Sequence, residues 1–175
     1  MIRLPANTLA TVPCSYESLP RSDKENPMLT SLEKLNQALR ENRPEAYVSP
    51  LHTALGMRPL QFRPGSSVWE WNAVQEHVLN PFQLVAGGYL AVFADEVLAS
   101  ALGSLLEEGE FATTAELKMS FLKPAAKGVM RGEGQVLRKG RRVAFVEATI
   151  TNAQGEMVAK ASSTWTVATA TSPRE

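Results

Sequence analysis

Two carboxylates stand out because they interrupt a long apolar segment. Between Pro81 and Leu106 the only charged residues are Asp95 and Glu96. A carboxylate on a buried helix loses its hydration, and little compensates for this loss unless the carboxylate is paired, so burial raises its pKa and suits it to general-base work near neutral pH. Asp95 is therefore a candidate catalytic base. The alternative is that it caps or hydrogen-bonds a neighbouring strand. Glu96 points about 100° away around a helix, and we expect it to be solvated or paired.

The start of the same segment offers backbone chemistry. Ala86, Gly87 and Gly88 place N–H groups without bulky side chains at the expected N-terminus of a helix. Such groups favour negative charge and can hold a developing oxyanion, although a tight turn that needs glycine is the alternative. Gly88 precedes Asp95 by seven residues, which is roughly 10 Å along a helix. If both act in one site, two subunits contribute to it.

Other catalytic and metal-binding patterns are missing from the sequence. It has no GxSxG elbow, no P-loop, and no CxxC or HExxH pair. Gly132-Glu133-Gly134 does not complete GxGxxG, because Leu137 takes the third position. His52 and His77 lack companion ligands, so the sequence predicts no metal site. We interpret Cys14 as incidental rather than as a reactive thiol.

Hydrophobic periodicity and turn signals indicate the elements that must carry these residues. Residues 1–27 contain four prolines and predict an irregular arm. Thr30 and Glu33 have capping-box spacing for a short helix that closes near Arg43-Pro44. A buried helix is expected at 86–106, and strands are expected at 56–62, 67–74, 113–122, 129–138, 142–151 and 157–167. The predicted class is α+β, with an antiparallel sheet wrapped around one long central helix.

Several side chains on those strands have predicted faces. Trp69 and Trp71 share one face of their strand, and burial is favoured over stacking on a ligand. Strand 113–122 alternates, which places four apolar side chains on one face: Ala115, Leu117, Met119 and Phe121.

Composition narrows the classes of function. The 175 residues include 18 basic and 18 acidic side chains, 44% hydrophobic residues and one cysteine. The zero net charge argues against nucleic acid as the partner, the hydrophobic content excludes a disordered chain, and one cysteine excludes an intramolecular disulfide. The sequence predicts no signal peptide, and a central Asp95 argues against a membrane span. We expect a cytoplasmic protein.

The balanced charge conceals a segregation along the chain. Residues 94–117 carry a charge of −6, and residues 118–142 carry a charge of +7. The basic excess ends in a turn whose clustered cations are suited to phosphate, although a solvated hairpin turn is the alternative. This basic turn comprises Arg138, Lys139, Arg141 and Arg142.

The order of several motifs resembles a known family. Asn80-Pro81-Phe82, Ala86-Gly87-Gly88 and Asp95 resemble the PaaI-type hotdog-fold thioesterases, which have Asn-Pro, His-Gly-Gly and an acid seven residues after the second glycine. Residues 116–125 and 136–148 match two further segments of that family. The resemblance covers about residues 50–168. It implies an N-terminal extension with a short helix at 1–45, a hotdog domain at 46–168 and a flexible tail at 169–175.

This resemblance implies hydrolysis of acyl-CoA thioesters without a metal or organic cofactor. Asp95 then activates the attacking water or attacks directly, and Thr114 helps to hold the water. Asn80 and the Gly87 N–H polarise the thioester carbonyl from the partner subunit, and Gly88 is a substrate-binding neighbour. The resemblance also implies homodimers with a continuous sheet, or tetramers built from such dimers.

The sequence departs from the family pattern at two positions. Ala86 replaces the motif histidine, and Gln83 stands where glycine is usual, so that it could supply a substituting amide to the substrate or block the pocket. Ala86 supports an alternative, a non-catalytic hotdog module that binds acyl-CoA or a related small ligand. A hotdog dehydratase needs an Asp/His pair, which neither histidine forms in an evident motif. The basic turn is the expected CoA-phosphate contact, and three aromatic residues are candidates for setting pocket depth: Phe82, Tyr89 and Phe93.

Overall fold

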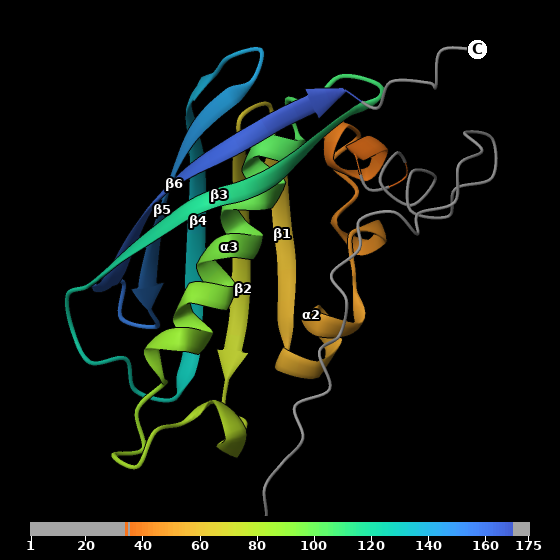
Figure 1. Cartoon of the computed structure of the whole chain (residues 1–175). Coiled ribbons are helices and arrows are strands. Elements are labelled where there is room, and N and C mark those ends of the chain that lie inside the picture. Colours follow the sequence, from red (N-terminus) through yellow and green to blue (C-terminus); the bar gives the residue numbers. More distant parts are fainter. Residues whose placement is uncertain (1–33, 35, 170–175) are drawn as a thin grey trace, which may run out of the picture.

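The computed structural model describes residue 34 and residues 36–169. Residues 36–40 of this part are helical, whereas the predicted capping box at Thr30 and the Cys14 prediction lie outside the described residues. The remaining elements follow in chain order (Figure 1): η2 Pro44–Ala46, α2 Pro50–Leu55, β1 Met57–Arg63, β2 Ser66–Ala73, η3 Glu76–Val78, α3 Gly87–Gly103, β3 Glu110–Phe121, β4 Gly128–Lys139, β5 Val143–Asn152 and β6 Met157–Thr169.

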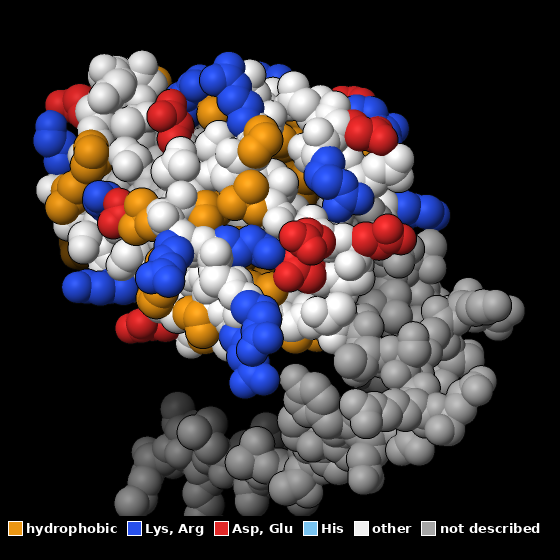
Figure 2. Space-filling model, turned by 90° about the horizontal axis from the view of Figure 1, so that it is seen from above, with side chains coloured by type: hydrophobic (Ala, Val, Ile, Leu, Met, Phe, Trp, Pro, Cys, Tyr) orange, Lys and Arg blue, Asp and Glu red, His pale blue; other side chains and the backbone are white. Residues whose placement is uncertain are grey.

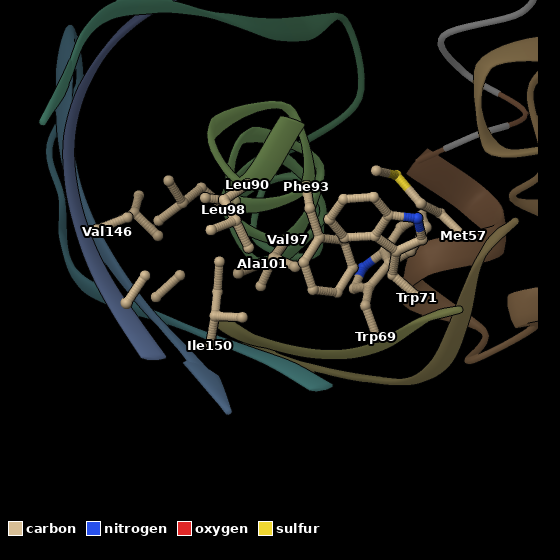
Figure 3. Close-up of a cluster of buried hydrophobic side chains, with 14 of the residues drawn as sticks. Met57, Trp69, Trp71, Leu90, Phe93, Val97, Leu98, Ala101, Val146 and Ile150 are labelled. Atoms are coloured by element: carbon tan, nitrogen blue, oxygen red, sulfur yellow. The ribbon is translucent and has the colours of Figure 1, made fainter. Parts of the chain in front are cut away.

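One antiparallel sheet of six strands wraps around α3. The strand order is β1-β2-β4-β5-β6-β3, and every neighbouring pair is antiparallel. The strands curl so that β3 crosses on the side of α3 that is opposite β4, with the helix enclosed between them (Figures 1 and 3). The prediction of an α+β class with one central helix is confirmed. β1 and β3 form the two edges of this sheet.

The core lies between α3 and the concave face of the sheet (Figure 3). Trp69 and Trp71 of β2 are both 0% exposed, so the predicted burial is confirmed. Each indole also finds an acceptor, because the Nε1–H groups donate to Ser100 Oγ and to the Leu55 carbonyl, both at 2.7 Å. A buried tryptophan needs such a partner. These bonds fix β2 to α3 and to α2.

Two glycines of β4 let α3 approach the sheet closely. A Cβ added to Gly132 would lie 2.6 Å from Val97 Cγ2, and one added to Gly134 would lie 2.7 Å from the Val97 carbonyl oxygen. The strand therefore has room for the helix backbone only because both positions lack a side chain. The Gly-Glu-Gly sequence that failed to complete a nucleotide-binding motif serves helix packing.

The structure corrects two sequence-based expectations, the end of the helix and the apolar face of one strand. α3 ends at Gly103 rather than at residue 106, since the next residue, Ser104, uses its hydroxyl to accept from the Gly65 N–H at 2.8 Å. The predicted apolar face of strand 113–122 is wrong in part, because a bulge between Thr114 and Glu116 breaks the alternation and leaves Ala115 exposed. In that face, Leu117 and Met119 pack against the core and Phe121 is 54% exposed.

Within the described part of the chain, no helix combines the length and the apolar character that a membrane crossing requires.

We expect Gly134→Ala to destabilise the fold, because the nearest atoms to its new Cβ include the Val97 backbone oxygen, which cannot move aside without shifting α3. Overpacking of this kind costs about 1–3 kcal/mol. Thermal denaturation followed by circular dichroism measures the effect. Gly88→Ala is the matched control, since nothing lies within 4 Å of its Cβ. Equal melting temperatures for the two variants would contradict the close approach.

Candidate active site

Asp95 lies near the middle of α3, on a face of the helix that the sheet leaves partly open. Ala91, Asp95 and Ala99 are each partly exposed, whereas Phe93 and Val97 on the opposite side are buried. The short side chains on either side of Asp95 leave the carboxylate accessible. This face of small residues ends at Leu102, which is fully buried.

Thr114 of β3 meets Asp95 across the helix–strand contact. Its hydroxyl donates to Asp95 Oδ1 at 3.0 Å. A bulge begins at Thr114, because the register of β3 against β6 shifts between Thr114 and Glu116 before regular pairing resumes. The structure thus brings together the two residues that were expected to share one subunit.

The surroundings of Asp95 raise the pKa of its carboxyl above the usual range. Burial is the largest cause, because it disfavours the charged form, and the neighbouring charge of Glu96 acts in the same direction. The hydrogen bond from Thr114 opposes both by stabilising the carboxylate. A carboxyl whose pKa is raised toward neutrality can both accept and return a proton.

The loop before α3 gives Asn80 a defined orientation. Asn80 Oδ1 accepts from the backbone N–H groups of Phe82 at 2.9 Å and Leu84 at 3.1 Å. Because both donors are backbone N–H groups, the side-chain atom that they meet must be the oxygen. Within the described residues, the Asn80 amide nitrogen has no acceptor and is left as a hydrogen-bond donor for another group.

Gly87 and Asn80 line one open groove. Its volume is about 430 Å³, and the residues that can supply polar groups to it include Asn80, Gly87 and Lys123. The other lining residues are Leu84, Val85, Leu90, Phe121, Leu122, Pro124 and Ala125. A Cβ on Gly87 would lie 3.0 Å from the Phe121 ring, so only glycine leaves the helix start open at this point.

The N-terminus of α3 presents free donors to this groove. Ala86 is the N-cap and makes no side-chain cap bond. Among the described residues, no acceptor contacts the N–H of Gly87 or Gly88. The first amides of a helix lack intrahelical partners and carry the positive end of the helix dipole, so they suit a negative oxygen. The groove therefore combines oxyanion donors with apolar walls.

The two halves of the predicted site do not meet within one chain. Gly87 and Asp95 are eight residues apart on α3, which is roughly 12 Å, and Asp95 is not among the residues that line the groove. Gly88 lies in open space beside the groove. Gln83 is exposed and has a left-handed φ of 60°, a conformation that explains why glycine suits this position. Contacts of Gln83 and Gly88 with a substrate stay predictions.

The basic turn lies at the opposite end of the molecule from Asn80 and Gly87. It connects β4 to β5 at the end where α3 finishes (Figure 1), and Figure 2 views this end, where several Lys and Arg side chains lie alongside Asp and Glu side chains. Lys139 Nζ lies 2.7 Å from Glu110 Oε2, and this pair is mostly buried. Lys139 thus holds the turn against β3. The three arginines are exposed: Arg141 and Arg142 in the turn itself, and Arg138 on β4.

Several residues around the site differ from the sequence-based expectations. Phe93 belongs to the core and packs on Trp71, and Phe82 is 80% exposed, so neither lines the groove. Phe121 and Leu122 do line it, and no sequence pattern indicates this, because they lie at the end of β3 and directly after it, far along the chain from Asn80. Glu96 was expected to be solvated or paired, and it is paired, since His52 Nε2 lies 2.7 Å from Glu96 Oε2.

No cluster of three or more potential metal ligands occurs among the residues that the structure describes.

Comparisons with known proteins identify relatives of this chain by sequence and by structure. The family model described as the thioesterase superfamily matches residues 82–159. A candidate thioesterase from Ralstonia eutropha JMP134, described as related to phenylacetic acid degradation, is 31% identical, with a TM-score of 0.67 over 76% of this chain and 98% of that one. The PaaI protein of the E. coli phenylacetic acid degradation operon is 25% identical, with a TM-score of 0.64 over 78% of this chain and 93% of that one.

Two further comparisons are more limited. A thioesterase from Haemophilus influenzae has a TM-score of 0.69 over 78% of this chain and 94% of that one, but only 18% identity, so it supports the fold alone. A candidate esterase of Saccharolobus solfataricus is 48% identical over 52 residues, which is 30% of this chain and 37% of that protein. A second candidate esterase of the same organism is 36% identical over 62 residues, which is 35% of this chain and 41% of that protein. Each match spans less than half of that relative.

We expect Asp95→Asn to stabilise the protein near pH 7. Because the pKa of Asp95 is raised in the folded state, the folded protein binds more protons than the unfolded chain between the two pKa values, and its stability falls as the pH rises through that window. Asparagine removes this penalty. Melting temperatures at several pH values test it, and the gain should shrink as the pH falls toward about 4. Glu108→Gln, at an exposed position, is the control; a gain that is independent of pH would contradict the assignment.

Proposed function

Because this chain belongs to the thioesterase superfamily and has the hotdog fold, we propose that it is an acyl-CoA thioesterase with Asp95 as its catalytic carboxylate. The prediction of a PaaI-type hotdog relative is confirmed. The observation that carries the proposal is the environment of Asp95: a carboxylate with a raised pKa, on an open helix face, and held by Thr114 at 3.0 Å. Few structural roles require a partly desolvated carboxylate that faces open space.

The proposed reaction needs only groups that the chain supplies. Asp95 takes a proton from water, whose oxygen attacks the thioester carbonyl carbon, and the electron pair of the C=O bond moves to the oxygen. The Gly87 N–H and the Asn80 amide nitrogen stabilise that oxyanion. Collapse of the intermediate breaks the C–S bond, and the proton held by Asp95 returns to the departing thiolate. Direct attack by Asp95 through an anhydride, which water then hydrolyses, is the variant of this scheme.

We infer that the active site forms between two subunits. β3 is an edge of the sheet, so its outer backbone groups are free to pair with a second strand. Pairing of two copies of β3 about a two-fold axis continues the sheet and reverses the partner. Asn80 and Gly87 of one subunit then approach Asp95 of the other, which resolves their separation of roughly 12 Å along one helix.

The same reversal gives the basic turn a role. It lies at the end of α3 away from its own Asn80 and Gly87 (Figure 1), so a reversed partner brings its Asn80 and Gly87 toward this end. A thioester held there directs its CoA portion toward Arg141 and Arg142, whose guanidinium groups suit phosphate. The apolar residues of the groove are the proposed acyl-binding surface. The local positive charge supports CoA as the substrate class.

A non-catalytic acyl-CoA-binding module is the second candidate function. Ala86 is the specific observation in its favour, because it removes an imidazole that the family usually places beside the oxyanion donors. This candidate keeps the groove and the basic turn but gives Asp95 only a structural role. Calorimetric binding of CoA without turnover of any thioester would support it.

We expect the wild-type protein to hydrolyse at least one acyl-CoA in a panel of short, medium-length and aryl thioesters. Asp95→Asn keeps the size of the side chain but cannot accept the proton, so kcat should fall by about 100-fold or more. Release of free thiol, followed with a chromogenic reagent, measures the rate. Glu108→Gln is the control. Equal rates for the wild type and Asp95→Asn would reject Asp95 as the catalyst.

Mixing two inactive variants tests the composition of the site. Asp95→Asn and Asn80→Ala each damage a different half of it, and each should be nearly inactive alone. In a mixed dimer, one site receives Asp95 from one subunit and Asn80 from the other, so coexpression in equal amounts should restore about a quarter of the wild-type activity. If both residues act from the same subunit, the mixture stays as inactive as its components.

A further inference from the structure

A buried histidine outside the proposed catalytic residues contacts the same part of α3. His52 lies in α2 and is 3% exposed. Its Nε2 is 2.7 Å from Glu96 Oε2, and Glu96 is the residue next to Asp95. A short contact between an imidazole and a carboxylate at a buried position is a directed interaction rather than a surface ion pair.

The capping box of α2 determines which ring nitrogen of His52 carries the proton. The Ser49 backbone N–H donates to His52 Nδ1 at 3.0 Å, and the Ser49 hydroxyl accepts from the His52 backbone N–H at 3.4 Å. Because Nδ1 accepts a hydrogen bond, it carries no proton in this arrangement. Nε2 is then the protonated nitrogen, and it donates to Glu96. Glu96 Oε2 is the acceptor of this hydrogen bond.

Tyr47 encloses the pair from the segment before α2. Its ring stacks on His52 with centroids 5.9 Å apart and meets Trp69 edge-on at 5.8 Å. Burial is the main cause that raises the pKa of the Tyr47 hydroxyl, and the charges of Glu96 and Asp95 add to it. Tyr47 therefore stays a neutral phenol near both carboxylates. The segment from Tyr47 to His52 is a cover over this part of α3.

We propose that His52 and Glu96 are positioning residues for Asp95: the Nε2–H donor of His52 holds Glu96 as a carboxylate beside Asp95, and this fixed negative charge keeps Asp95 ready to accept a proton. This inference rests on the proposed function for its catalytic meaning, but the charge relation itself is a property of the fold. It also gives residues 44–55, which precede the sheet, a role in the site.

The groups that act on Asp95 are few. Glu96 faces it from α3 itself and raises its pKa, Thr114 faces it from β3 and lowers it, and Tyr47 is the titratable group that approaches from the cover. His52 acts only through Glu96. In the described part of the chain, the side chains that face α3 from β2 and β4 at the closest contacts are uncharged: they are apolar, glycine or Ser67, whose hydroxyl donates to the Val97 carbonyl. Removal of the Glu96 charge should therefore reach Asp95 without compensation from another acid.

Glu96→Gln tests the proposal with little risk to the fold, because the glutamine oxygen can still accept from His52 Nε2. The sequence contains only two aspartates, Asp23 and Asp95, so a protein labelled with 13C in the Asp carboxyl carbons gives two titrating signals, which Asp95→Asn assigns. We expect the Asp95 midpoint to fall by about half a pH unit or more in Glu96→Gln. Glu147→Gln, which removes a carboxylate paired with Lys160, is the matched control and should leave the midpoint unchanged.

The two histidines provide a second readout. Nitrogen-15 spectra of the imidazoles of His52 and His77 report the tautomer, and the signal of buried His52 should show a protonated Nε2 in the wild type and in Glu96→Gln. An unchanged Asp95 midpoint in Glu96→Gln, or a His52 signal with its proton on Nδ1, would overturn the proposal.

The pH dependence of kcat/KM separates this inference from the proposed function. In an active enzyme, the acidic limb of the kcat/KM profile should move to lower pH in Glu96→Gln by the same amount as the Asp95 midpoint, which a purely structural role of Glu96 would not cause. If no acyl-CoA is hydrolysed by the wild type, the proposed function fails while the carboxyl titration still decides whether Glu96 acts on Asp95.

Discussion

Asp95 is a carboxylate on a helix that the sheet surrounds on most sides, and the cost of removing its hydration shapes the structure around it. α3 must bury its apolar side chains in the sheet, which fixes the glycines of β4 against Val97 and the tryptophans of β2 against Ser100 and Leu55. The same helix must leave one face open, so that Asp95 keeps contact with water. Small residues and a bulge at Thr114 meet this second requirement.

These two requirements also explain why one chain is insufficient for the proposed chemistry. The donors at the start of α3 cannot move toward Asp95, because both are fixed to the same rigid helix, eight residues apart. A second subunit removes the conflict, since a two-fold axis reverses the helix while it preserves each local environment. The free edge of β3, and its half-buried Leu117 and Met119, are the features that fit such a pairing.

Residues whose roles depend on local pattern were accessible from the sequence. Asp95 was identified because it interrupts an apolar segment, and the strands were identified because alternation and turn residues mark them. Features that depend on contacts between distant segments were not accessible. Phe121 reaches Gly87 only through the crossing of β3 over α3, and His52 reaches Glu96 from 44 residues away. The bulge at Thr114 could not be predicted either, because the segment Thr-Thr-Ala-Glu contains no glycine or proline that would indicate it.

Ala86 is the departure that most challenges an enzymatic role, and its position as N-cap limits what it removes. A capping Ser, Thr, Asp or Asn places a side-chain oxygen on the second or third amide of a helix, where it competes with a bound ligand for the N–H groups. Ala86 makes no such bond. The donors proposed for the oxyanion are backbone N–H groups and the Asn80 amide, none of which belongs to the missing imidazole. The substitution therefore removes a supporting side chain and leaves in place the donors for a carbonyl oxygen, which both candidate functions use, so the role of Asp95 rather than the missing imidazole decides between catalysis and binding.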